Sequence, residues 1–144
     1  MTGRNRIDGY RQVRKGWHDF GNGRRFYFKS LWELNIARYL EWLRLRGDIE
    51  DWQYEPDTFW FPVKRGTTNY KPDFRVVENT GAWFYIEVKG YMNARSKTAL
   101  QRMKKHHPTV DLRLYDGPVY RSIVKDWGHL FGATEEWIDA EVAD

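Results

Sequence analysis

Two short strings of residues have the side chains with the clearest capacity for chemistry. Pro72-Asp73-Phe74 begins one strand-like run, and Glu87-Val88-Lys89-Gly90 ends the next. Because a strand places alternate side chains on one face, Glu87 and Lys89 point in the same direction and Val88 in the opposite one. If Asp73 lies beside them, two carboxylates and one ammonium group converge. Such a set can hold Mg²⁺ against a phosphate and activate a water molecule.

The pattern around these strings predicts how they are brought together. Alternating apolar residues predict strands over 70–77 and 82–88, and the polar turn at 79–81 joins them into an antiparallel hairpin. Phe84, Ile86 and Val88 share one face of the second strand, which we expect to be the core face. Glu87 and Lys89 lie on the other face, at its end.

A helix precedes the hairpin and supplies a third acidic residue. Ser30 is a suitable N-cap with Glu33 three residues later, and Gly47 ends the helix. Glu33 lies just off the edge of the apolar stripe that should face the core. Two interpretations of Glu33 stay open, because it completes a capping box with Ser30 and could also face the two strings.

The remaining elements predict an α/β fold with a small mixed β-sheet flanked by helices. A basic helix over 94–107 ends at Pro108, a strand follows around 110–114, and helices are expected over 119–127 and after Thr134. Residues 1–25 show no sustained period, so we expect a basic N-terminal arm that is partly ordered or exchanged between subunits. Residues 26–144 are expected to form a single domain.

Composition limits the chemistry. The 144 residues include no cysteine, and the four histidines lack metal-ligand spacing, so any bound metal should sit on oxygen. No apolar run approaches the length of a membrane span, and the N-terminus lacks an apolar signal core. We therefore expect a cytoplasmic protein that does not associate with membranes.

Basic residues gather in two clusters that suit a polyanion. Residues 1–25 hold seven Lys or Arg against two Asp, and residues 89–105 hold six without one acid. Such clusters bind phosphates through counterion release, although a solvated arm and a solvated helix face would have the same composition. The candidate DNA-binding residues are Arg11, Arg14, Lys15, Arg24, Arg25, Lys29, Arg95, Lys97, Arg102, Lys104 and Lys105.

Together these features resemble the PD-(D/E)XK nuclease superfamily, whose motif stands here as Pro72-Asp73 and Glu87-Val88-Lys89. The resemblance implies a restriction-endonuclease-like core in which Asp73 and Glu87 ligate a metal, aided by the Val88 carbonyl. Lys89 would orient the attacking water or stabilise the transition state, and Glu33 would complete the metal sphere. Taken singly, the same residues are also explained by a surface Glu87–Lys89 ion pair and a turn at Pro72-Asp73.

Within that superfamily the chain looks most like small phage-encoded Holliday junction resolvases of the endonuclease-I type. This likeness implies a Mg²⁺-dependent endonuclease, with Mn²⁺ as a substitute, that acts as a homodimer on branched or four-way DNA. If the chain is phage-encoded, it would work in the host cytoplasm. Two alternatives stay open: a recombination-associated or nicking nuclease subunit that acts with a partner, and a DNA-binding module without catalysis.

Overall fold

A four-stranded mixed sheet forms the centre of the protein. The computed structural model describes residues 15–134. The sheet has the order β3-β6-β7-β8, with β3 (Asp51–Tyr54), β6 (Phe74–Val77), β7 (Trp83–Val88) and β8 (Leu112–Tyr115). The first three strands are antiparallel neighbours, and β8 runs parallel to β7. The predicted α/β fold with a small mixed sheet is confirmed.

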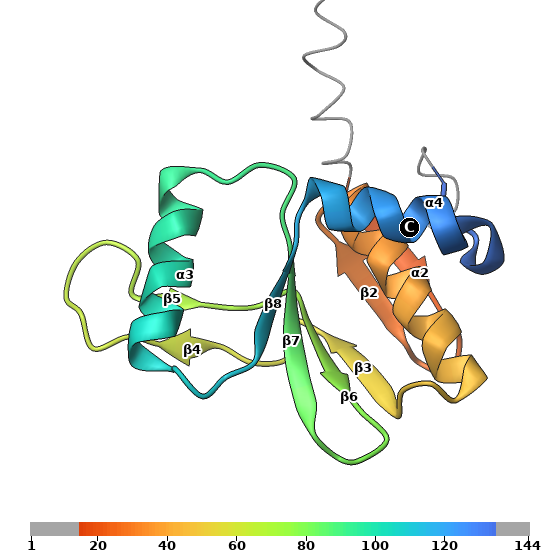
Figure 1. Cartoon of the computed structure of the whole chain (residues 1–144), viewed down its shortest axis with the longest axis horizontal. Coiled ribbons are helices and arrows are strands. Elements are labelled where there is room, and N and C mark those ends of the chain that lie inside the picture. Colours follow the sequence, from red (N-terminus) through yellow and green to blue (C-terminus); the bar gives the residue numbers. More distant parts are fainter. Residues whose placement is uncertain (1–14, 135–144) are drawn as a thin grey trace, which may run out of the picture.

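Three helices within the described range flank this sheet: α2 (Leu31–Arg46), α3 (Ala94–His106) and α4 (Gly117–Phe131). Figure 1 shows α2 and α4 on one side of the sheet and α3 on the other. Helix α3 is the crossover that a parallel β7–β8 pair requires. None of the helices in residues 15–134 is both long enough and apolar enough to cross a membrane.

The boundaries of α2 follow the predicted local signals. The Ser30 hydroxyl accepts a hydrogen bond from the Glu33 N–H at 3.1 Å. At the other end Gly47 has φ 83°, a left-handed conformation that glycine adopts without a Cβ clash. Leu34 and Ile36 of α2 are fully buried in the same core cluster as the sheet residues Phe74 and Ile86. This shared core holds α2, and with it Glu33, against the sheet.

The predicted hairpin over 70–77 and 82–88 is confirmed in part. Strands β6 and β7 pair antiparallel with Phe74 opposite Ile86, and Phe84, Ile86 and Val88 lie in the core as expected. Tyr70, however, belongs to a separate strand, because Pro72 lacks the N–H that a continuous ladder needs. A small hairpin of β4 (Phe59–Trp60) and β5 (Asn69–Tyr70) forms there instead.

Part of the predicted N-terminal arm, from residue 16 onward, has regular structure. Strands β1 (Gly16–Asp19) and β2 (Arg25–Phe28) form an antiparallel hairpin whose turn has positive φ at residues 21–23. Two glycines and an asparagine make this tight turn possible, and apolar side chains of the hairpin pack on Trp52. Residues 1–14, with Arg11 and Arg14, and the helix expected after Thr134 lie outside the described residues.

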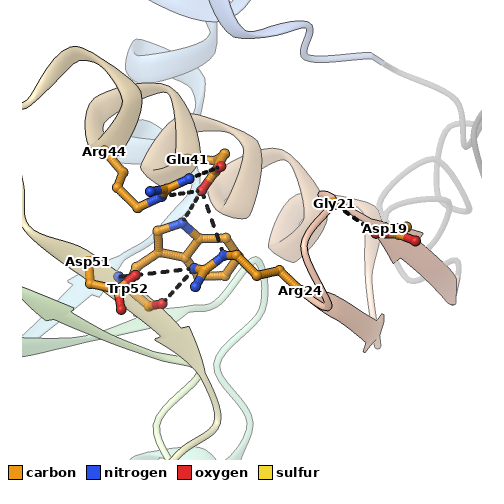
Figure 2. Close-up of polar contacts among 7 residues, drawn as sticks. All are labelled: Asp19, Gly21, Arg24, Glu41, Arg44, Asp51 and Trp52. Carbon is orange, nitrogen blue, oxygen red and sulfur yellow. Dashed lines mark hydrogen bonds and ion pairs between the residues drawn. The ribbon is translucent and has the colours of Figure 1, made fainter.

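A polar network ties the N-terminal hairpin to α2 and β3 (Figure 2). The Glu41 carboxylate accepts hydrogen bonds from the Trp52 indole N–H at 2.9 Å and from the Arg44 guanidinium at 2.7 and 2.9 Å. Arg24 donates to the Trp52 carbonyl at 2.9 Å and pairs with Asp51 at 3.3 Å. Arg24, a DNA-binding candidate, is therefore engaged in holding the fold together.

Candidate functional site

The two acidic strings converge at one end of the central sheet. Phe74 pairs with Ile86, so the same register carried one residue further places Asp73 beside Glu87. Asp73 also accepts a hydrogen bond from the Val88 N–H, at 2.7 Å through its Oδ2. Both carboxyl-bearing residues are buried, with Asp73 7% and Glu87 6% exposed. The predicted meeting of the strings is confirmed.

Glu87 has two partners that hold its carboxylate in place. Its Oε1 accepts a hydrogen bond from the Tyr70 hydroxyl at 2.5 Å, and its Oε2 lies 3.4 Å from the Lys89 ammonium nitrogen. Glu87 and Lys89 therefore share one side of β7, as the alternation predicts. The Lys89 side chain is 29% exposed, so its ammonium group lies at the boundary between the buried carboxylates and solvent.

Glu33 serves both the helix and the site. Its N–H bonds to the Ser30 cap, whereas its carboxylate accepts a hydrogen bond from the Tyr54 hydroxyl of β3 at 2.5 Å. Burial is the main cause that raises the pKa of the Glu33 carboxyl, and the charges of Glu55 and Glu87 raise it further. The cap uses the backbone of Glu33 and leaves its carboxylate near the two strings.

The carboxylates of Glu33, Asp73 and Glu87 repel one another in a poorly hydrated space. The pKa of Asp73 lies well above its ordinary value, first because of burial and then because of the Glu33 and Glu87 charges. Burial also raises the pKa of Glu87, against the lowering influence of Tyr70 and Lys89. A bound cation would relieve this repulsion.

Two further charged residues, Glu55 and Lys29, lie beside the three carboxylates, and no motif in the sequence marks either of them for this place. Glu55 follows β3 with φ 50°, a strained conformation for a residue other than glycine, and its N–H donates to the Asp73 carbonyl at 2.8 Å. Its carboxylate pairs with the Lys29 ammonium at 2.8 Å. The pKa of Lys29 is raised, chiefly by a hydrogen bond to Glu55, and the charges of Glu33 and Asp73 add to the effect.

The donor set suits a small, hard cation. Mg²⁺ prefers carboxylate and carbonyl oxygens and retains several waters, so the Asp73 and Glu87 carboxylates with the Val88 carbonyl would hold it, with Glu33 nearby. Within residues 15–134 no three acidic or histidine side chains form a group arranged to hold a metal. In the described conformation Tyr70 and Lys89 occupy the Glu87 oxygens, and Tyr54 occupies one oxygen of Glu33. A metal ion bound to these carboxylates would replace some of these hydrogen bonds and the ion pair.

The predicted basic residues fall into different places. On α3, Arg95, Lys97, Lys104 and Lys105 are exposed, as binding to a polyanion requires. Arg102 instead donates to two backbone carbonyls of the loop between β4 and β5, at 2.5 and 3.2 Å. The exposed Lys15 lies just before the N-terminal hairpin, and Arg25 stacks over the Trp17 ring within it.

A scan against protein-family models finds no match to this chain, and a search of curated proteins finds no significant match. The functional interpretation therefore rests on the residues of the site and their geometry.

Proposed function

We propose that the protein is a metal-dependent, structure-selective DNA endonuclease, and most specifically a Holliday junction resolvase with a restriction-endonuclease-like core. The observation that carries the proposal is the convergence of Asp73, Glu87 and Lys89 from two neighbouring strands. A buried carboxylate pair beside an accessible ammonium group combines metal ligands with a cation for the phosphate. A module that only binds DNA gains nothing from buried acids near phosphates.

Each residue of the site has a chemical role in this proposal. Asp73 and Glu87 bind the metal, and the hydrogen bond from the Val88 N–H fixes the orientation of the Asp73 carboxylate. The Lys89 ammonium lies where it can stabilise the charge that builds up on the scissile phosphate. When bound, Mg²⁺ would polarise the phosphate and lower the pKa of the attacking water.

The small domain favours recognition of DNA shape over base sequence. No separate domain for reading bases is evident in the described residues, and the exposed cations of α3 suit backbone phosphates. One site cuts one strand, so paired cuts across a junction require a second copy. A homodimer with two-fold symmetry would provide it most simply.

The test compares cleavage of a four-way junction with cleavage of a linear duplex of matched sequence in Mg²⁺. We expect faster cutting of the junction by the wild type and loss of cutting in Asp73→Ala. Asp126→Asn, which removes an exposed carboxylate on α4, is the control and should cut normally. Equal cutting of both DNAs would contradict the resolvase assignment. Persistent cutting by Asp73→Ala would show that Asp73 is not part of the active site.

Two negative results would each support a different function for the protein. Metal binding without cleavage of any DNA would indicate a nicking or recombination-associated subunit that needs a partner. Retained DNA affinity without metal binding in calorimetry would indicate a DNA-binding module.

A further inference from the structure

A cleft of about 360 Å³ opens beside Glu87 and Lys89. One wall is formed by Asn69, Tyr70 and Lys71, at the end of the β4–β5 hairpin, and a second wall by the first turns of α3. The Tyr70 hydroxyl that holds Glu87 belongs to this wall. The cleft is therefore continuous with the candidate catalytic residues.

The charge of the cleft suits an anion. Lys71, Lys89 and Arg95 all line it, against one acid, Glu87, which Tyr70 and Lys89 already engage. Helix α3 begins at the same place, and its first turn carries no acidic residue that would neutralise the positive end of the helix dipole. A phosphate group in the cleft would meet cations on both walls.

The rest of the lining suits the uncharged part of a nucleotide. Ala99 and Leu100 give the cleft an apolar portion, and Tyr70 also lines it. A volume near 360 Å³ lies at the low end of the roughly 300–1,000 Å³ found for small-molecule sites. The cleft therefore has room for about one nucleotide and none for a double helix.

The two walls are fastened to each other. Arg102 of α3 donates to the carbonyls of Thr67 and Arg65 in the hairpin loop, at 2.5 and 3.2 Å. Near the other end of the helix, a His107 ring nitrogen lies 2.9 Å from the Trp60 carbonyl oxygen. These contacts hold the cleft open in its described shape, so little ordering of the hairpin is needed when a ligand binds.

We propose that this cleft binds one unpaired nucleotide of the cleaved strand, next to the scissile phosphate. The inference rests on the proposed nuclease function and adds to it the feature of DNA that the enzyme selects. A base within a duplex must unpair and unstack before it can enter, whereas an unpaired base at a bulge, or a base freed from its stack at a branch point, enters at a smaller penalty. Recognition of branched DNA would then arise beside the reacting phosphate as well as from the wider basic surface.

The test measures binding by fluorescence anisotropy in an Asp73→Asn background, so that cleavage does not interfere. The probes are a duplex with one unpaired nucleotide and the same duplex fully paired. Arg95→Ala should lower the preference for the unpaired nucleotide about tenfold, the effect of losing roughly 1.4 kcal/mol of contact. Lys105→Ala, which removes the same charge from an exposed position on the same helix, should weaken both complexes equally.

A second variant separates this role from a general loss of charge. Leu100→Trp fills the cleft without changing charge, and it should abolish the preference while leaving affinity for the paired duplex intact. An unchanged preference in Leu100→Trp, or equal effects of Arg95→Ala and Lys105→Ala, would overturn the inference. If the wild type cuts no DNA but the preference depends on Arg95 and Leu100, the nucleotide site stands and the nuclease assignment fails.

Discussion

The hydrogen bond from Tyr70 to Glu87 gives the site a pH-dependent contribution to stability. Tyr70→Phe keeps the ring and removes the hydroxyl that lies 2.5 Å from the Glu87 Oε1. A hydrogen bond to a charged group contributes about 1.5–3 kcal/mol to folding, and one between neutral groups about 0.5–1.5 kcal/mol. The variant should therefore lose about 1.5–3 kcal/mol of unfolding free energy when Glu87 is ionised, and less when it is protonated.

The direction of the pH dependence follows from the carboxylate. Burial raises the pKa of the Glu87 carboxyl in the folded protein above its value in the unfolded chain, so ionisation of Glu87 lowers the stability of the fold. The stability that protonated Glu87 gives is fully present below the pKa of the unfolded chain and is lost as the pH rises through the pKa of the folded protein. Tyr70 counteracts that loss, because its hydrogen bond favours the ionised form. The stability difference between wild type and Tyr70→Phe should therefore be smallest near pH 4 and increase toward pH 8.

Urea unfolding at a series of pH values, without divalent metal, measures this difference. Tyr91→Phe is the matched control, since Tyr91 is 73% exposed and its hydroxyl should matter little at any pH. A difference that stays constant with pH, or an effect no larger than that of Tyr91→Phe, would show that the Tyr70 hydroxyl does not stabilise the ionised Glu87 carboxylate.

Three further predictions concern charge burial, the polar network and the end of α2. Asp73→Asn should stabilise the metal-free protein at pH 8 and not near pH 4, because the raised pKa of Asp73 marks an unfavourable buried charge; equal unfolding curves at pH 8 would contradict this. Glu41→Gln weakens the bond to the Trp52 indole and should lower the unfolding free energy by about 1–3 kcal/mol, whereas the exposed Glu50→Gln should have little effect. Gly47→Ala places a Cβ at φ 83° and should lower the thermal midpoint by a few degrees, about 1 kcal/mol, and an unchanged midpoint would exclude this strain.

Local patterns were sufficient for the parts of the fold that neighbouring residues determine. Ser30 and Gly47 mark the ends of α2 because caps act within one turn of the helix. The alternation before Lys89 correctly placed Val88 in the core and Glu87 on the other face. Asp73 could be expected beside Glu87 because a short turn leaves an antiparallel hairpin with few possible registers.

Contacts between distant segments were not predictable from such patterns. Tyr54 reaches Glu33 across 21 positions and Tyr70 reaches Glu87 across 17, and no local spacing marks either pair. The strained backbone of Glu55 lies where the pairing of β3 with β6 ends and its N–H bonds to the Asp73 carbonyl, a contact that appears only when the sheet is assembled. Residues 21–23, Gly-Asn-Gly, are a sequence signal for the turn of the N-terminal hairpin. The charged residues around them favoured the interpretation as a basic arm instead.

We propose that Asp73 and Glu87 hold a divalent cation against a DNA phosphate. Anomalous diffraction from crystals grown with Mn²⁺ and a four-way junction would locate that cation. We expect a Mn²⁺ peak bound by the carboxylates of Asp73 and Glu87, with a DNA phosphate beside it and the Lys89 ammonium facing that phosphate. DNA bound elsewhere on the surface, or no metal peak at these carboxylates, would contradict it.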